Sequence, residues 1–295
     1  MTDSLNAAVL QAEEVGCSLG ELAIRQEVQE GLRTRDDLEA GLRRALEVMR
    51  GAVQRGLPGD LRSVSGLVGG DAAKLSRLGG PLRGTLFTEV LARALAVQEV
   101  NAAMGVIVAA PTAGGAGVLP GLLLGLADRG LANDEQLVRG LATAGLIGAV
   151  VATRASLSGA EGGCQAETGA AAAMAAGAGV EVLGGTPTMA AHAVSLAMQG
   201  TLGLVCDPLG GLVEVPCVFR NATGAAIALA AVEMAMAGIV FPIPADEVID
   251  TMGEIGRTMD VRYRETAGGG LAATPTGRRL AKERLVQIKR SGTKV

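Results

Sequence analysis

The chain is nearly devoid of aromatic side chains: its 295 residues include three Phe, one Tyr and no Trp, although 49% of them are hydrophobic. A core in a chain of this length must therefore be built from Ala, Leu, Val and Met, with glycine allowing close backbone contacts. Small side chains suit tightly packed helices. The stretches 139–155, 168–183 and 221–240 are long, Ala-rich and free of strand alternation. We therefore predict an all-α fold, a single helical domain of Ala/Gly-rich packed helices.

Charge distinguishes the N-terminal segment from the rest of the chain. Residues 1–58 mix acids and arginines and predict amphipathic helices over 21–30 and 35–53, the second ended by a glycine and a proline. We expect this segment to pack on the core or on a partner. Residues 59–295 are expected to form the catalytic part of the chain.

The remaining elements follow from local signals. A glycine-rich loop over 65–70 leads into a helix over 72–78, with Asp71 as the expected N-cap. Further along, 245–258 predicts an amphipathic helix and 278–288 a basic helix, on either side of an irregular Gly-rich loop over 264–276. Alternating helices and Gly/Pro loops fill the region between.

Charge and hydropathy argue against two classes of partner. The net charge is −4 and no basic block is present, which argues against nucleic acid. The charge-free stretch 102–127 is long enough to span a membrane. However, Pro111, Pro120 and six glycines would leave backbone groups unpaired in lipid, so we expect two buried helices around a loop at 111–117. The N-terminus shows no signal-peptide pattern, which predicts a cytoplasmic protein with reduced thiols.

Three of the four cysteines lie in glycine- or proline-rich turns: Cys164, Cys206 and Cys217. Their separations, 42 and 11 residues, match no compact zinc spacing. Four thiolates close an electron-transfer cluster, whereas a catalytic metal site keeps one position open, so three thiolates favour a Lewis acid. The residues alone support this interpretation and a set of buried structural thiols about equally. Cys17 lies outside any such motif and is not expected to be a ligand.

Distinctive stretches recur along the chain from Ser65 onward. They are SGLVGGD (65–71), NAAMG (101–105), APTAGGAG (110–117), SGAEGGCQAE (158–167), GLVCDP (203–208), VPCVFRNA (215–222), and RET with GLAATPT (264–276). In these stretches the chain resembles the alpha chain of the iron–sulfur-dependent L-serine dehydratases (L-serine ammonia-lyases). The resemblance implies that Cys164, Cys206 and Cys217 bind a [4Fe–4S] cluster with one open iron, around which the helices pack. It also implies conversion of L-serine to pyruvate and ammonia, with the iron acting as a Lewis acid on the β-hydroxyl.

The residues within these motifs offer candidates for substrate binding. Thr112 lies in a loop without the Lys-Ser/Thr ending of a phosphate loop; this loop predicts either a carboxylate nest or a tight helix crossing. Arg220 and Asn221 follow Cys217 directly and are expected in substrate-binding or supporting roles. Arg264 is expected either to bind a carboxylate through two hydrogen bonds or to pair with an acid such as its neighbour Glu265. Ser65, at the start of the first glycine-rich motif, completes the set.

Three residues are candidates for the general base: Lys74, Glu161 and Glu167. Lys74 follows the first glycine loop, and the two glutamates flank Cys164. Each glutamate is equally compatible with a structural role. His192, the only histidine, lies in an apolar helical stretch and is interpreted as a helix residue rather than a catalyst.

The resemblance also bears on partners. Single-chain members of the family carry a further domain with a Ser-Ser-His-Thr motif, and split-chain members keep it in a separate beta chain; this sequence lacks the motif. We therefore expect a beta chain and an oligomer. Some single-chain members end in a cysteine that caps the free iron, whereas this chain ends in 290–295 without one. The alternatives are a non-enzymatic iron–sulfur sensor or binding subunit and a pyridoxal-phosphate dehydratase built on Lys74.

Overall fold

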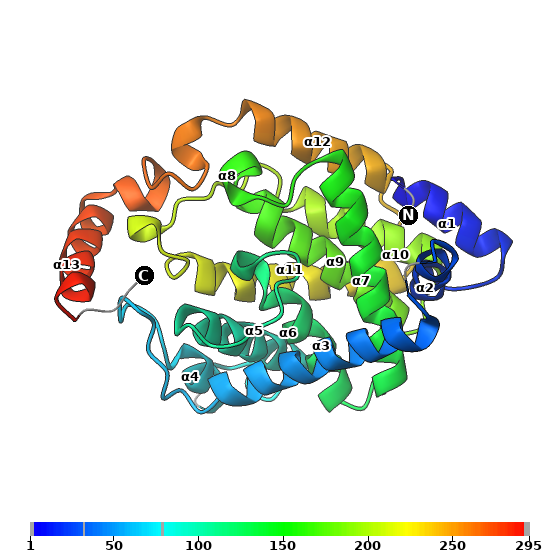
Figure 1. Cartoon of the computed structure of the whole chain (residues 1–295), viewed down its shortest axis with the longest axis horizontal. Helices are drawn as coiled ribbons and strands as arrows, with labels where there is room; N and C mark the ends of the chain where they lie inside the picture. The colour runs from blue at the N-terminus through cyan, green and yellow to red at the C-terminus, as the bar shows by residue number, and fades with distance from the viewer. Residues whose placement is uncertain (1–2, 32, 78–79, 292–295) are drawn as a thin grey trace.

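Helix α9 (Ala170–Val182) lies at the centre of the protein, and every one of its residues except Glu181 is buried. The computed structural model describes residues 3–31, 33–77 and 80–291. Small residues allow the neighbours of α9 to approach closely: a Cβ added at Gly177 would lie 2.3 Å from Cδ1 of Ile147, and one at Gly179 would lie 2.7 Å from Cγ2 of Val232. The helices packed around α9 are α6 (Val118–Asp128), α7 (Asp134–Arg154), α10 (Pro187–Gln199) and α11 (Cys217–Met236) (Figure 1).

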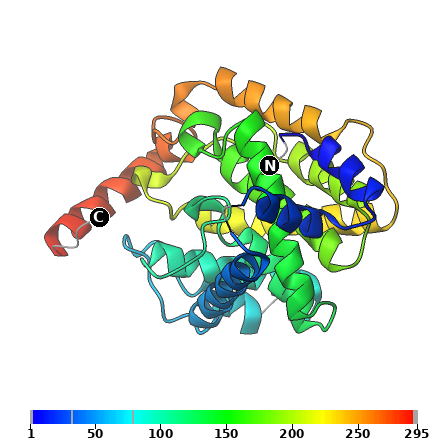
Figure 2. The ribbon, with the colours of Figure 1, turned by 45° about the vertical axis from the view of Figure 1, so that its right-hand side comes forward.

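The predicted all-α fold is confirmed, because the described residues form helices and connecting loops with no β-strand. The Ala-rich stretches predicted as helices correspond to α7, α9 and α11. The π-helix η2 (Gln165–Gly169) runs directly into α9, and Cys164 precedes it. The predicted helix over 245–258 is α12 (Ala245–Thr258), and the last helix is α13 (Pro275–Ser291), which extends away from the body of the protein (Figure 2).

The N-terminal helices α1 (Leu5–Glu14), α2 (Leu19–Gln29) and α3 (Arg35–Gly56) pack on this body. Their N-termini are capped by Ser4, Ser18 and Thr34, whose side chains accept backbone hydrogen bonds. Their apolar side chains belong to the same buried cluster as those of α7 and α9. The segment therefore covers the core, as one of the two expectations had it, while the functional boundary at residue 58 stays a prediction.

The first glycine loop differs from expectation in how its helix is capped. Helix α4 (Asp71–Arg77) begins at Asp71, so Asp71 is its first helical residue and not its N-cap. The orphan amides are satisfied by the buried carboxylate of Glu99 on α5 (Leu86–Ala102), which accepts hydrogen bonds from Gly70, Asp71 and Ala72 at 2.9, 2.6 and 3.0 Å. A side chain 27 to 29 positions away thus does what a local cap was predicted to do. The predicted end of this helix, Leu78, lies outside the described residues.

The charge-free stretch 102–127 was expected to form two buried helices, but only the second is present. After α5 ends at Ala102, residues 103–112 form a loop with Met104 and Val106 exposed, followed by the short 3₁₀ helix η1 (Ala113–Gly115) and most of α6. Gly105 and Pro111 disfavour a helix in the first half. Two other helices, α7 and α11, are long and apolar enough to cross a membrane by length and composition alone. Within them, 67% and 50% of the apolar window is buried inside the protein. Core helices of this kind pass the same test, so the finding is weak evidence for a membrane.

Candidate active site

The three motif cysteines converge from separate elements. Cys164 precedes η2, Cys206 forms an isolated backbone bridge with Arg264, and Cys217 is the first residue of α11. All three are free and buried, with exposures of 3%, 2% and 6%. The thiols of Cys164 and Cys206 share a hydrogen bond. Cys17 lies elsewhere, beside Glu21 and Arg25 of α2.

Glycines make room for this convergence. A Cβ on Gly159 would lie 2.5 Å from Oε2 of Glu167 and 3.2 Å from Sγ of Cys206. Gly163, directly before Cys164, has φ +77°, and a Cβ there would lie 2.9 Å from the Leu204 carbonyl oxygen. Any larger residue at either position would displace the cysteine segments. Glycine is therefore required at these two positions, because the segments that carry the cysteines approach each other closely there.

The protonation of the thiols depends on burial and on one another. The hydrogen bond with Cys206 lowers the pKa of Cys164 to about 7, and the same bond raises the pKa of Cys206. Burial raises the pKa of Cys217 to about 12. Because a thiol binds a metal as its thiolate, metal binding would release the protons that these cysteines carry.

This donor set fits an iron–sulfur cluster. Three buried, unpaired thiols on three separate segments provide three thiolate ligands and no fourth from Cys17. The guanidinium of Arg220 lies close enough to favour the ionised forms of Cys164 and Cys217. Three thiolates satisfy all but one iron of a four-iron cluster.

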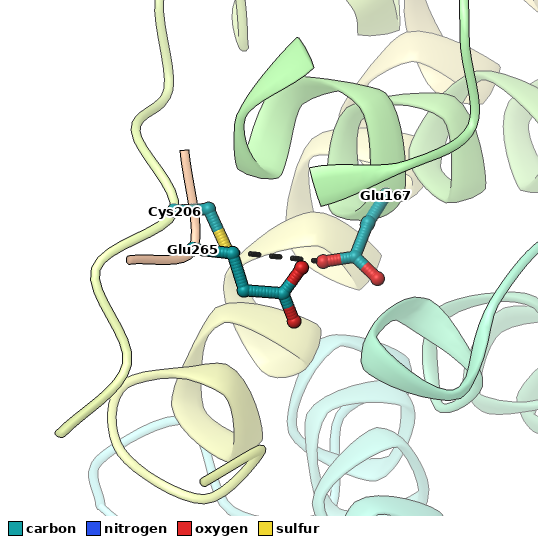
Figure 3. Close-up of side chains that lie close together, drawn as sticks. All are labelled: Glu167, Cys206 and Glu265. Carbon is teal, nitrogen blue, oxygen red and sulfur yellow. Dashed lines mark hydrogen bonds between the residues drawn. The ribbon is translucent and has the colours of Figure 1, made fainter. Parts of the chain in front are cut away.

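Two carboxylates face one another beside the cysteines (Figure 3). Oxygens of Glu167 and Glu265 and the sulfur of Cys206 lie within 4.8 Å of one another. Oε1 of Glu167 accepts a hydrogen bond from the Thr112 hydroxyl at 2.7 Å, and its Oε2 lies 3.9 Å from Sγ of Cys206. Burial, reinforced by the charge of Glu265, raises the pKa of Glu167 above that of an ordinary glutamate, against the opposing Thr112 hydrogen bond.

Two adjoining cavities open next to these groups. The first, of about 430 Å³, includes Arg257 and Arg264 in its lining, and the second, of about 480 Å³, includes Thr112, Glu167 and Glu265. The residues common to both are Ala155, Ser156 and Glu161. Each cavity is large enough for a small metabolite.

Asp207, the residue after Cys206, connects that cysteine's segment to two other segments. Its Oδ1 forms an ion pair with Nη1 of Arg220 at 2.8 Å, and its Oδ2 accepts a hydrogen bond from the Leu271 amide at 2.6 Å. Arg220 also donates to the Val205 carbonyl at 2.8 Å. Arg220 is therefore held next to Cys206 by contacts within the chain, and this arrangement suits a supporting role.

The amide of Asn221 is fully engaged inside the protein. Its Oδ1 accepts hydrogen bonds from Gly117 N at 2.8 Å and from Nε2 of Gln98 at 3.2 Å. Its Nδ2 donates to the carbonyls of Gly114 at 2.6 Å and Cys217 at 2.9 Å. An Asn amide can make four such bonds, and all four are made here. Asn221 therefore fixes the Thr112 loop against the start of α11, which favours a positioning role.

Of the other predicted site residues, Ser65 and Lys74 lie outside the linings of the two cavities, whereas Glu161 lines both. Ser65 is buried and bonded through its hydroxyl and its amide to the Glu214 carboxylate. The Lys74 side chain is 68% exposed and paired with Asp71 at 2.7 Å. Glu161 is exposed and accepts a hydrogen bond from the Ser156 hydroxyl at 2.6 Å. These placements leave Glu167 as the base candidate in contact with a cysteine.

Arg264, a predicted substrate-binding residue, and His192, which was not expected to be catalytic, lie in different places. Arg264 lines the first cavity, its Nε is buried without a partner, and among the described residues it forms no ion pair, including none with Glu265. His192 lies on α10 in a separate surface groove with residues of α1 and the segment before α12.

Sequence reasoning did not assign site roles to Glu265, Gln98 or Glu214. Glu265 was considered only as an ionic partner of Arg264, and its left-handed backbone, with φ +63°, has no signal in a single sequence. Gln98 and Glu214 form hydrogen bonds with residues that lie more than 100 positions away along the chain. The position of Glu214, three residues before Cys217, was the one available hint.

The chain is similar to known proteins over most of its length. The family described as "Serine dehydratase alpha chain" matches residues 14–272. The "Probable L-serine dehydratase, alpha chain" of Bacillus subtilis is 52% identical over 268 residues, covering 90% of this chain and 89% of that protein. The "L-serine dehydratase, alpha chain" of Peptoniphilus asaccharolyticus is 38% identical, covering 92% and 94%.

A longer relative matches as well. The "L-serine dehydratase 2" of Escherichia coli is 39% identical over 285 residues, which cover 90% of this chain but 61% of that protein. The resemblance carried by the motif stretches between Ser65 and Thr276 is thus confirmed over most of the sequence, and the chain belongs to the serine dehydratase alpha chain family.

Proposed function

We propose that the chain converts L-serine to pyruvate and ammonia, with Cys164, Cys206 and Cys217 holding a [4Fe–4S] cluster. The observation that carries the proposal is the convergence of three buried, free thiols beside a cleft lined by Glu167 and Glu265. When bound, a cluster with one iron not ligated by cysteine would supply a Lewis acid. The names of the relatives support serine as the substrate.

Glu167 is the proposed proton acceptor for the α-hydrogen. It lines the cleft, Thr112 fixes one of its oxygens, and its raised pKa brings proton exchange closer to neutral pH. Loss of the α-proton and of the β-hydroxyl as water gives aminoacrylate, which tautomerises to the imine and hydrolyses to pyruvate and ammonia. Lys74 and Glu161 remain weaker candidates, because one pairs with Asp71 on the surface and the other is exposed.

We further propose that activity requires a separate beta chain. The two relatives that this chain covers almost completely are named alpha chains, and the longer Escherichia coli relative extends beyond the matched region. A second polypeptide would supply what this chain does not, including further acid–base groups. An oligomer in the cytoplasm, acting in amino-acid degradation that feeds gluconeogenesis, completes the proposal.

Anaerobic reconstitution with iron and sulfide, followed by a pyruvate assay with and without a candidate beta chain, tests the proposal. We expect a broad iron–sulfur absorbance and turnover of L-serine that increases when the beta chain is added. A bound cluster without turnover in either mixture would favour a sensor or binding subunit. A pyridoxal absorbance would contradict the metal assignment, for which the exposed, ion-paired Lys74 gives no support.

A further inference from the structure

We propose that Arg264 and Glu265 form a receptor for a zwitterionic α-amino acid, in which Arg264 binds the α-carboxylate and Glu265 binds the α-ammonium group. The inference rests on the proposed serine chemistry and names the groups that select the substrate. Its starting point is that two consecutive residues line two adjoining cavities of opposite charge.

The anionic end of the substrate fits the cavity of Arg264. Nε of Arg264 is buried without a hydrogen-bond partner, and among the described residues no carboxylate forms an ion pair with this guanidinium. Arg257 lines the same cavity, and the one acid there, Glu161, already accepts a hydrogen bond from Ser156. A buried polar atom without a partner calls for a ligand, and a guanidinium matches a carboxylate through two parallel hydrogen bonds.

The cationic end fits the second cavity. Oxygens of Glu265 and Glu167 lie within 4.8 Å of each other, and neither residue forms an ion pair with Lys or Arg in the described part of the chain. Two carboxylates at this separation repel, and an ammonium group between them removes the repulsion. Figure 3 shows the Glu265 carboxylate directed toward that of Glu167.

The backbone fixes the two halves of the receptor relative to each other and to the cysteines. The Glu265 amide donates to the Cys206 carbonyl at 2.8 Å, and the Cys206 amide donates to the Tyr263 carbonyl at 2.8 Å. Between these bonds, the left-handed φ of +63° at Glu265 turns the chain, so that Arg264 and Glu265 line different cavities. The carboxylate and ammonium of an amino acid are carried by one carbon, so the ligand would lie where the two adjoining cavities meet, beside Ala155, Ser156 and Glu161. The receptor excludes hydroxy acids, which lack the ammonium group, and amides, which lack the carboxylate.

Binding of three small molecules to the wild-type chain, reconstituted with its cluster and beta chain, tests this selection. L-alanine carries both charges but no hydroxyl to eliminate, L-lactate lacks the ammonium group, and L-alaninamide lacks the carboxylate. We expect L-alanine to bind at least about tenfold more tightly than either of the others, measured by competition with L-serine and by NMR titration. Equal binding of all three would overturn the proposal without any variant being made.

Variants assign each half of the receptor. Glu265→Gln should raise the KM for L-serine by about tenfold or more and weaken L-alanine, while leaving L-lactate unchanged. Arg264→Gln should weaken L-alanine and L-lactate but not L-alaninamide, with partial recovery in Arg264→Lys. The matched control is Arg262→Gln, because Arg262 lies two residues away, is exposed and pairs with Asp260 at 3.0 Å.

The outcomes separate this inference from the proposed function. Iron and sulfide content is measured for every variant, so that loss of the cluster is not mistaken for loss of binding. If Glu265→Gln weakens L-lactate as much as L-alanine, the ammonium assignment is wrong. If the wild-type protein discriminates the three ligands as expected but forms no pyruvate from L-serine, the receptor stands and the proposed reaction fails.

Discussion

The loops around the cysteines and the N-terminal helices are held in place by different means. In the loops that lead to the cysteines, single buried polar side chains each bind several groups. Asn221 and Glu99 bind backbone amides and carbonyls, and Glu214 binds two serine hydroxyls and one amide. In α1–α3, apolar stripes pack on the core, and exposed caps and ion pairs support the helices; the buried carboxylate of Asp246 at the start of α1 is the exception. Irregular backbone needs specific partners for its amides and carbonyls, whereas a helix satisfies most of its own. One side chain should therefore matter far more in the first region than in the second.

The largest expected effect is loss of the metal centre. Replacing any one of Cys164, Cys206 or Cys217 by Ala should abolish cluster binding and activity, because each supplies one of three ligands. Cys17→Ala should leave both intact, since Cys17 lies beside α2. Iron and sulfide analysis of the four purified variants measures this. A Cys206→Ala protein with full iron content would refute the ligand assignment.

Asn221→Ala should produce the largest loss of stability among single polar replacements in the site loops. It removes four hydrogen bonds and leaves the buried Gly117 amide and Gly114 carbonyl without the Asn221 side chain, so we expect a cost of about 2–4 kcal/mol. Urea denaturation of the metal-free chain measures it. Asn133→Ala, which removes the exposed N-cap of α7, should cost about 1 kcal/mol. Equal losses in the two variants would remove the proposed difference between buried and surface polar groups.

Replacing one buried carboxylate in each region should have effects of intermediate size on stability. Glu214 accepts hydrogen bonds from Ser63 and Ser65 beside the Cys217 segment, and Asp246 accepts them from Ser4, Leu5 and Asn6 at the start of α1. We expect Glu214→Gln and Asp246→Asn each to cost about 1–2 kcal/mol of stability.

Their functional consequences should differ. Glu214→Gln should also weaken iron binding, because it loosens the segment that leads into Cys217. Asp246→Asn should leave iron content unchanged and make residues 3–14 more sensitive to protease. Iron analysis and limited proteolysis on both proteins give the answer, and unaltered iron binding in Glu214→Gln would show that this loop does not position the cysteine.

The smallest expected effect is at the surface. Partial burial raises the pKa of Glu21, but hydrogen bonds from Arg35 and Arg25 outweigh it, so the pKa is lowered in the folded protein. The resulting stability is present above the unfolded pKa of about 4.3 and is lost as pH falls through the lower folded value. Glu21→Gln should therefore cost less than about 1 kcal/mol at neutral pH, with the difference from wild type disappearing in acid. Denaturation midpoints of the variant and the wild type, measured between pH 3 and pH 7, test this. A difference in stability that does not change with pH would show that the ion pair is not the cause of the stabilisation.

The same contrast explains what could be predicted from the sequence. Helices α3 and α12 carry local signals, namely periodicity and helix-ending residues, and their predicted extents were close to those observed. The start of α7 was predicted five residues late, because its cap at Asn133 was missed. The cysteines were recognisable because their turns are distinctive. The capping of α4 was predicted wrongly, because the carboxylate that satisfies its amides lies on α5 and leaves no local trace. The facing of Glu265 toward Glu167 depends on one left-handed residue and on a bridge to Cys206, neither of which a single sequence shows.

The small side chains of helix α9 set how closely the neighbouring helices can pack around it. Larger side chains at Gly177 or Gly179 would collide with α7 or α11, while further glycines in place of its alanines would weaken the helix. Because η2 continues into α9, any thickening there would shift Cys164 relative to its partners on other segments. Sequence drift in α9 is thus confined to a few small residues, while the outer face of α3 is free to exchange polar side chains. The position of the Cys164 thiol therefore depends on alanines and glycines farther along the same helix.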